Sequence, residues 1–221
     1  MRGALKNIRA AIFDLDGTLF DSVGLWREID DIFLAKRGLV PTDDYLDKIA
    51  AIGFRAAADF TVEYFKLDDK PEQLMDEWTE LAREAYATTV KTFDGAREYI
   101  RECAATGIKI AAVTSLHREF AEACLKNNGI YEYFTHIFTS DDTGLNKSSP
   151  AIYAHAAKLL GVEPSECVVY DDVTVAVKAA KAAGMTTVAV AGLMLDKAEC
   201  GEFADFVVRS LKDAPAFARK Q

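Results

Sequence analysis

Residues 8–22, IRAAIFDLDGTLFDS, constrain the fold more than any other part of the chain. The first six are mostly apolar without polar alternation, as in a strand buried on both faces of a parallel sheet. Asp14 and Asp16 follow that strand directly, and Gly17 then supplies a turn residue. Open α/β sheets bind ligands at the carboxyl ends of their strands. The stretch therefore predicts two acids at such an edge, although an ordinary Asx turn would use the same residues.

From residue 93 onward, apolar strands alternate with amphipathic helices. We expect strands at 108–113, 136–139, 167–170 and 187–190, with a possible edge strand at 204–208. Helices are expected at 94–105, 119–127, 150–160 and 173–183, a polar loop at 141–150, and a polar C-terminal tail. This alternation predicts right-handed crossovers and a doubly wound parallel sheet, which is an α/β fold.

Residues 21–89 predict helices only. Helical periodicity is found at 23–36 and at 43–50. Gly53 then interrupts it, and the periodicity returns after Gly53 and again from Pro71. We therefore predict two domains: an α/β core of residues 1–20 and 90–221, and a small helical insertion of residues 21–89. The insertion leaves the core at the carboxyl edge of the sheet, where a lid over a site would lie.

Composition excludes several classes of partner. The 221 residues are 50% hydrophobic, enough for a sizeable core, and carry a net charge of -9. Nucleic acid and anionic membranes are poor partners for such a chain, because no basic run offsets the repulsion. The four cysteines form no CxxC pair, and neither a signal peptide nor a membrane-spanning run is found. These features predict free, buried cysteines and a cytoplasmic protein.

Polar residues mark four strand ends or the loops beside them. They are Asp14 and Asp16, Thr114 and Ser115, Lys147, and Asp171 and Asp172. Each has an ordinary explanation, since hydroxyls and acids cap helices and loop lysines are usually solvated. Parallel strands place all their carboxyl ends at one edge, so the four groups are expected to converge.

This combination resembles the haloacid dehalogenase (HAD) superfamily, specifically its phosphatase branch with a helical, C1-type cap. DLDGT, the strand-end Thr114, Lys147 in GLNKSSP and Asp171-Asp172 after CVVY carry the resemblance. It covers nearly the whole chain and implies a Rossmann-like core similar to that of phosphoglycolate phosphatases and β-phosphoglucomutases, with residues 21–89 as the cap.

The resemblance also implies catalytic roles. Asp14 would attack phosphorus to form an aspartyl-phosphate, and Asp16 would serve first as general acid and then as general base. Thr114, helped by Ser115, would hold phosphate oxygens, and Lys147 would neutralise the nucleophile and the phosphoryl group. The electrostatics agree, because a carboxylate and a phosphate charge about 3.5 Å apart repel by about 5 kcal/mol at an effective dielectric of about 20.

A magnesium ion is implied on the acids, with Asp14, the Asp16 backbone carbonyl, Asp171 and Asp172 as its ligands. Oxygen ligands without histidine or cysteine suit Mg²⁺ better than Zn²⁺. Three positions depart from the family pattern: Ser148 replaces a common proline, Asp171 a common Gly or Glu, and Ala176 a common acid. Metal binding is therefore expected to depend more on Asp172.

The sequence also predicts the contacts or environment of several other side chains. Arg55 in the insertion and His117 after the second motif are the candidates for substrate contact, with the adjacent Arg118 also within reach. A solvated Arg55 would fit its sequence context equally well. Both tryptophans, Trp26 and Trp78, are expected in the core, and both His136 and His155 are expected to be structural.

The function predicted is a Mg²⁺-dependent phosphatase acting on a small phosphorylated metabolite. A sugar phosphomutase similar to β-phosphoglucomutase is the alternative, but those enzymes use a cap histidine where this chain reads SVGLWRE. A dehalogenase is disfavoured by Asp16, and a non-catalytic binding protein by the four intact motifs. Sugar phosphates, phosphoglycolate and nucleotide monophosphates all stay open as substrates, and the sequence does not predict the oligomeric state.

Overall fold

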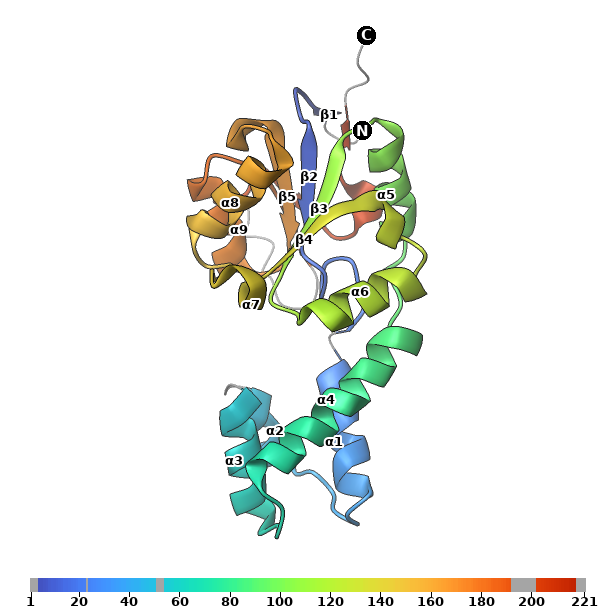
Figure 1. Cartoon of the computed structure of the whole chain (residues 1–221), viewed down its shortest axis with the longest axis vertical. Coiled ribbons are helices and arrows are strands. Elements are labelled where there is room, and N and C mark those ends of the chain that lie inside the picture. Colours follow the sequence, from blue (N-terminus) through green and yellow to red (C-terminus); the bar gives the residue numbers. More distant parts are fainter. Residues whose placement is uncertain (1–3, 23, 51–53, 192–201, 218–221) are drawn as a thin grey trace.

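A six-stranded parallel sheet forms the centre of the molecule (Figure 1). The computed structural model describes residues 4–22, 24–50, 54–191 and 202–217. The sheet has the order β4-β3-β2-β5-β6-β7. Its strands are β2 (Ala10–Phe13), β3 (Lys109–Thr114), β4 (Phe134–Thr139), β5 (Cys167–Asp171), β6 (Thr186–Val190) and β7 (Phe206–Val208). The predicted doubly wound sheet is confirmed, and β2 lies between β3 and β5.

Helices cover both faces of this sheet. They are α5 (Ala96–Ala105) and α6 (Arg118–Asn127) on one face, and α8 (Pro150–Leu160) and α9 (Thr174–Ala182) on the other (Figure 1). Alternate residues of β2 enter opposite cores: Phe13 joins the cluster that includes α5 and α6, and Ile12 joins the cluster beneath α8 and α9. Burial on both faces explains why the strand lacks polar alternation.

Four helices lie together beyond one end of the sheet, at the bottom of Figure 1. They are α1 (Leu25–Ala35), α2 (Asp43–Ala50), α3 (Phe54–Phe65) and α4 (Pro71–Thr88), and we call them the helical segment. The first part of α4 packs with α1 and α3, while its last turns contact α6, where Tyr86 stacks on Phe120 at 5.5 Å. In the described part of residues 21–89 all regular structure is helical, as predicted. The domain boundaries and the lid role stay predictions.

The polar-tail prediction for the C-terminus was wrong. A second, two-stranded parallel sheet joins β1 (Ala4–Leu5) to β8 (Ala216–Phe217), and the short 3₁₀ helix η3 (Leu211–Asp213) precedes β8. Leu211 and Ala214 are buried, and the Tyr99 hydroxyl donates to the Pro215 carbonyl at 2.7 Å. These residues cover α5, so they belong to the core.

The predicted polar loop at 141–150 begins as a helix instead. The short helix α7 (Ser140–Thr143) forms because the Thr139 hydroxyl accepts a hydrogen bond from the Asp142 N–H at 3.0 Å. Two further 3₁₀ turns, η1 (Tyr131–Tyr133) and η2 (Pro164–Glu166), precede β4 and β5.

Predictions about single side chains had mixed outcomes. Trp78 is buried, but Trp26 is 40% exposed and packs edge-on against Phe54, so its core assignment was wrong. Three cysteines are free and buried, as expected: Cys103, Cys124 and Cys167. Gly53 and Cys200 lie outside the described residues. His136 and His155 both pack against Phe138.

Among the described helices, none is long and apolar enough to cross a membrane.

Candidate active site

The DLDGT turn begins where β2 leaves the sheet. The Asp14 N–H still donates to the Tyr170 carbonyl of β5 at 2.9 Å, which holds Asp14 beside the end of that strand. The chain then closes a tight turn in which the N–H groups of Leu19 and Phe20 both donate to the Leu15 carbonyl at 2.9 Å. The turn keeps Asp14 buried at the carboxyl edge of the sheet.

Gly17 is required at the centre of this turn for two reasons. Its φ of +80° is a backbone conformation that other residues rarely adopt. A Cβ at this position would lie 2.2 Å from Oδ2 of Asp172. The glycine therefore lets the DLDGT turn and the end of β5 approach each other closely.

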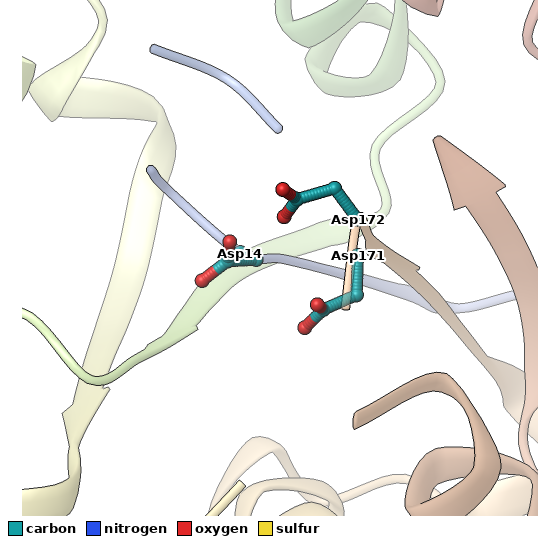
Figure 2. Close-up of side chains that lie close together, drawn as sticks. All are labelled: Asp14, Asp171 and Asp172. Atoms are coloured by element: carbon teal, nitrogen blue, oxygen red, sulfur yellow. The ribbon is translucent and has the colours of Figure 1, made fainter. Parts of the chain in front are cut away.

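Three carboxylates meet at this edge of the sheet. Asp14 follows β2, Asp171 ends β5 and Asp172 comes next, and Figure 2 shows the three side chains close together. All three are buried, and one carboxylate oxygen from each lies within 4.8 Å of the others. Thr18 fixes Asp172 by donating its hydroxyl to Oδ1 at 3.0 Å.

Lys147 contacts two of these acids. Its Nζ lies 2.6 Å from Oδ1 of Asp14 and 2.8 Å from Oδ2 of Asp171. The other oxygen of Asp171 accepts the Val173 N–H at 2.9 Å, so both oxygens of Asp171 contact protein groups. The sheet thus brings together residues that are more than 150 positions apart in the chain.

The charges of this cluster do not balance. Burial raises the pKa of Asp171 to about 7 and that of Asp172 to about 6, and the negative charge of Asp14 adds to both shifts. Burial alone would lower the pKa of Lys147, but Asp14 and Asp171 hold it above its ordinary value. One ammonium group thus faces three carboxylates, an arrangement that favours a bound cation.

The donor set fits a hard divalent cation. Every candidate ligand atom is a carboxylate oxygen, the type that Mg²⁺ and Ca²⁺ prefer. Opposite ligands of an octahedral Mg²⁺ with bonds of about 2.1 Å lie about 4.2 Å apart, and the three candidate ligand atoms all lie within 4.8 Å of one another. Asp14 and Asp172 are the better placed pair, because Asp171 is occupied by Lys147 and Val173.

Asp16 points to different partners. Ser22 donates its hydroxyl to Oδ1 at 2.7 Å, and Tyr86 of α4 donates to Oδ2 at 2.9 Å. The pKa of Asp16 is raised to about 6, mainly by burial and also by the charge of Asp14, while the hydrogen bonds from Ser22 and Tyr86 oppose the shift. A carboxyl group that titrates near neutral pH can both give and take a proton.

The second motif lies at the same edge, at the end of β3 beside β2. Thr114 is buried, and its Oγ1 accepts the Leu116 N–H at 3.1 Å, whereas Ser115 is exposed. The sheet order brings Thr114 next to the DLDGT turn, as predicted for strand ends. Phosphate binding by this pair stays a prediction.

The two candidates for substrate contact interact with surface acids. Arg55 pairs with Asp59 at 3.2 Å and with Glu72 at 2.7 Å, all within the helical segment. The exposed His117 precedes α6, and its Nδ1 lies 2.6 Å from Oδ2 of Asp141. These contacts place neither residue among the clustered acids, and substrate contact stays a prediction for both.

Three side chains of the site were not identified from the sequence. Thr18 holds Asp172, and Ser22 and Tyr86 hold Asp16. Thr18 belongs to the DLDGT motif, so the motif itself is the sequence signal for this residue. Nothing in the sequence around Tyr86 indicates a contact with Asp16, which lies 70 residues earlier.

The family model described as haloacid dehalogenase-like hydrolase matches residues 11–190. The chain belongs to the haloacid dehalogenase-like hydrolase family. A protein of Bacillus subtilis named "Putative phosphatase YhcW" is 32% identical over 83% of this chain and 83% of its own length. The "Phosphorylated carbohydrates phosphatase" of Thermotoga maritima is 28% identical over 80% and 82%.

Solved structures of HAD-like proteins also resemble this chain. A Thermotoga maritima structure described as a "putative beta-phosphoglucomutase" superposes with a TM-score of 0.84 at 26% identity, covering 93% of this chain and 96% of that one. The family assignment and the fold therefore agree, and the acid cluster lies within the matched residues.

Proposed function

We propose that this HAD-like hydrolase is a Mg²⁺-dependent phosphatase that hydrolyses a small phosphorylated metabolite. The observation that carries the proposal is the contact of Lys147 with Asp14 inside a buried cluster of three acids. The names of the relatives support a phosphoric monoester hydrolase. Repulsion between a carboxylate and a phosphate is the main obstacle to this chemistry, and the cluster is built to offset it.

The reaction would proceed in two steps. An Asp14 oxygen attacks phosphorus, the bond from phosphorus to the ester oxygen breaks, and the Asp16 carboxyl gives its proton to the leaving alcohol. Water then attacks the phosphoryl group on Asp14, Asp16 takes back a proton, and inorganic phosphate and the free Asp14 carboxylate are formed. A carboxyl pKa of about 6 suits Asp16 for both directions of transfer.

Lys147 and a cation would together offset the negative charge of the Asp14 carboxylate and of the phosphoryl group. The ammonium group of Lys147 already pairs with Asp14 and would extend to a phosphoryl oxygen, and Thr114 would donate its hydroxyl to another. Asp14 and Asp172, with the Asp16 backbone carbonyl, would hold Mg²⁺. Bound there, the ion would lower the negative potential that an incoming phosphate meets.

The helical segment would act as a cap. Its α4 contributes the Tyr86 hydroxyl to Asp16, so the proton donor of the core is held by a residue of the cap. Closure of such an element excludes water and completes the site. We expect such a cap also to select the substrate.

Release of inorganic phosphate from a panel of phosphorylated metabolites tests the proposal. We expect turnover that requires Mg²⁺, is abolished by chelation, and falls by at least about a thousandfold in Asp14→Asn. Asp21→Asn is the matched control, because it removes an exposed acid from the same loop. Mg²⁺-independent turnover, or full activity in Asp14→Asn, would contradict the proposal.

A sugar phosphomutase is the second candidate, favoured by the similarity to the Thermotoga maritima structure. The sequence SVGLWRE after Asp21 contains no histidine, and we therefore prefer hydrolysis. The two functions are separated by their products: a phosphatase releases inorganic phosphate, whereas a mutase yields an isomeric sugar phosphate.

A further inference from the structure

Tyr153 of α8 buries a hydroxyl group that no described residue pairs. The residue is fully buried, and its hydroxyl makes no hydrogen bond in the part of the chain that the structure describes. The only other buried side-chain atom of this kind among the described residues is the indole Nε1 of Trp78, on α4 of the helical segment. An unpaired buried hydroxyl lowers stability, so the one on Tyr153 needs an explanation other than folding.

The alternation of the strands directs two of the clustered acids to the face of the sheet that α8 covers. Ile12 of β2 and Val169 of β5 belong to the apolar cluster beneath α8, which also contains Tyr153. Side chains two positions apart along a strand point to the same face. Asp14 lies two positions after Ile12 and still hydrogen-bonds to β5 through its N–H, and Asp171 lies two positions after Val169. Both acids therefore continue the rows of side chains that pack beneath α8.

Helix α8 begins at the edge of the sheet where these acids lie. Lys147, three residues before the helix, contacts Asp14 at 2.6 Å and Asp171 at 2.8 Å. Tyr153 is the fourth residue of α8 and so belongs to its first turn. The charges agree with this placement: the pKa of the Tyr153 hydroxyl is raised mainly by burial and next by Asp171, and also by Asp14, while Lys147 opposes the shift.

Asp171 would lose a donor during the proposed reaction. One of its oxygens accepts the Val173 N–H at 2.9 Å, and the other contacts Lys147. In the proposed reaction, the Lys147 ammonium group extends to a phosphoryl oxygen, which draws it away from Asp171. A buried carboxylate that loses its partner is strongly destabilised unless another donor replaces that partner. The hydroxyl of Tyr153 is an unpaired donor on the same face of the sheet.

The Tyr153 hydroxyl suits this replacement better than a contact with the substrate. The side chain is buried in the apolar cluster beneath the acids, so an incoming phosphate meets the acids and Lys147 first. A neutral hydroxyl can donate to a carboxylate without adding a charge. The charge of Lys147 then stays available to the phosphoryl group.

We propose that Tyr153 is a positioning residue for Lys147: its hydroxyl donates to Asp171 when Lys147 moves to the phosphoryl group. This inference rests on the proposed phosphatase function. In the resting protein the hydroxyl is unpaired, and its hydrogen bond forms as Lys147 leaves Asp171. The bond therefore favours the transition state over the resting protein, so Tyr153 should affect kcat rather than KM.

Hydrolysis of p-nitrophenyl phosphate with saturating Mg²⁺, together with the melting temperature, tests the inference in Tyr153→Phe. We expect kcat to fall by about tenfold and KM to change by less than about twofold, because one hydrogen bond to a charged group is lost in the transition state. The melting temperature of the free protein should equal or exceed that of the wild type. Tyr45→Phe is the matched control: this buried hydroxyl pairs with Thr61 at 3.0 Å, so its loss should lower the melting temperature and leave kcat unchanged.

The same substitution in an Asp171→Asn background shows whether Tyr153 acts through Asp171. There, Tyr153→Phe should lower kcat by less than about threefold, because a neutral amide needs no replacement for the ammonium group. If Asp171→Asn is too slow to measure, the kcat and melting temperature of Tyr153→Phe decide alone.

The outcomes separate this inference from the proposed function. An unchanged kcat in Tyr153→Phe, or an equal loss in both backgrounds, would overturn the inference while the phosphatase function stands. A Tyr153→Phe protein that melts below the wild type would also overturn it, because the hydroxyl would then be paired in the resting protein. Wild-type protein that fails to hydrolyse p-nitrophenyl phosphate would overturn the proposed function and this inference with it.

Discussion

Among single residues, Gly17 determines how closely the DLDGT turn approaches β5. Replacement by alanine would place a Cβ 2.2 Å from Asp172 Oδ2 at a φ of +80°. We expect Gly17→Ala to lower the free energy of unfolding by about 1–3 kcal/mol and to weaken Mg²⁺ binding, because Asp172 must move. Urea unfolding and Mg²⁺ titration measure the two effects.

Gly24→Ala is the control for this change, because a Cβ at Gly24 meets nothing within 4 Å. It should leave Mg²⁺ binding unchanged. A Gly17→Ala protein with wild-type metal affinity would show that Asp172 is not a ligand or that the turn adapts freely.

Asp30 predicts how stability depends on pH. Burial of this α1 residue, together with the charge of Asp31, raises its pKa to about 7 in the folded protein. The pKa is about 3.9 in the unfolded chain, so the folded state binds the extra proton between these values. The free energy of unfolding contributed by Asp30 is therefore greatest below pH ~4 and is lost as pH rises through ~7. From pH ~5 to pH ~8, the free energy of unfolding of Asp30→Asn should therefore increase by about 3 kcal/mol relative to that of the wild type.

Urea unfolding at pH ~5 and at pH ~8 checks this expectation. Asp31→Asn, which also relieves the charge near Asp30, should show only a small part of the effect. Equal pH slopes for wild type and Asp30→Asn would mean that Asp30 is solvated or paired in solution.

Most residues of the acid cluster could be predicted from the sequence, because each follows a buried strand. Asp14, Asp171 and Asp172 were found in this way, and the structure brings them together with Lys147. The partners of Asp16 could not be found, since the contact of Tyr86 depends on how α4 lies against the core. Asp30 was not singled out either, because an acid in an amphipathic helix is usually solvated.

Among the elements, α4 connects the helical segment to the core. Its last turns stack Tyr86 on Phe120 of α6 and extend the Tyr86 hydroxyl to Asp16. That hydrogen bond favours the ionised carboxylate and lowers the pKa of Asp16. A residue of the helical segment therefore contributes to the protonation equilibrium of a carboxyl group beside the sheet.

Tyr86→Phe tests this connection. Loss of the hydroxyl should raise the pKa of Asp16, so the alkaline limb of the kcat/KM profile should move upward by as much as about one pH unit. Tyr131→Phe, at an exposed tyrosine near Lys126, is the control. A lower kcat/KM with an unmoved limb would assign Tyr86 a packing function only.

The short elements escaped prediction for a physical reason. β1 and β8 have two residues each and pair across more than 200 positions, so neither shows a periodic pattern of its own. The six strands of the main sheet were all expected, because their apolar runs are long enough to be distinguished from turns. Helix boundaries agreed within about two residues for the helices marked by proline or glycine at an end, such as α8.

For the whole molecule, the net charge of -9 and an anionic substrate have to be reconciled. Lys147 is buried at the site, and the cluster around it still carries an excess of acids. The protein therefore concentrates negative charge where its substrate would bind, and a bound divalent cation would reverse the local sign. Stability and metal binding should be linked as a consequence.

This linkage predicts opposite effects of one substitution with and without metal. Mg²⁺ at a hundredfold excess over its Kd should stabilise the wild type by about 2.7 kcal/mol, which raises Tm by several degrees. Asp172→Asn should show no such response. Without Mg²⁺ at pH ~8, however, the variant should melt above the wild type, because the pKa of Asp172, about 6, means that its buried charge opposes folding. Asp141→Asn, at an exposed acid, controls for net charge. A metal-free Asp172→Asn protein that melts below the wild type would show that the acids stabilise the fold directly, and the electrostatic account of the site would be wrong.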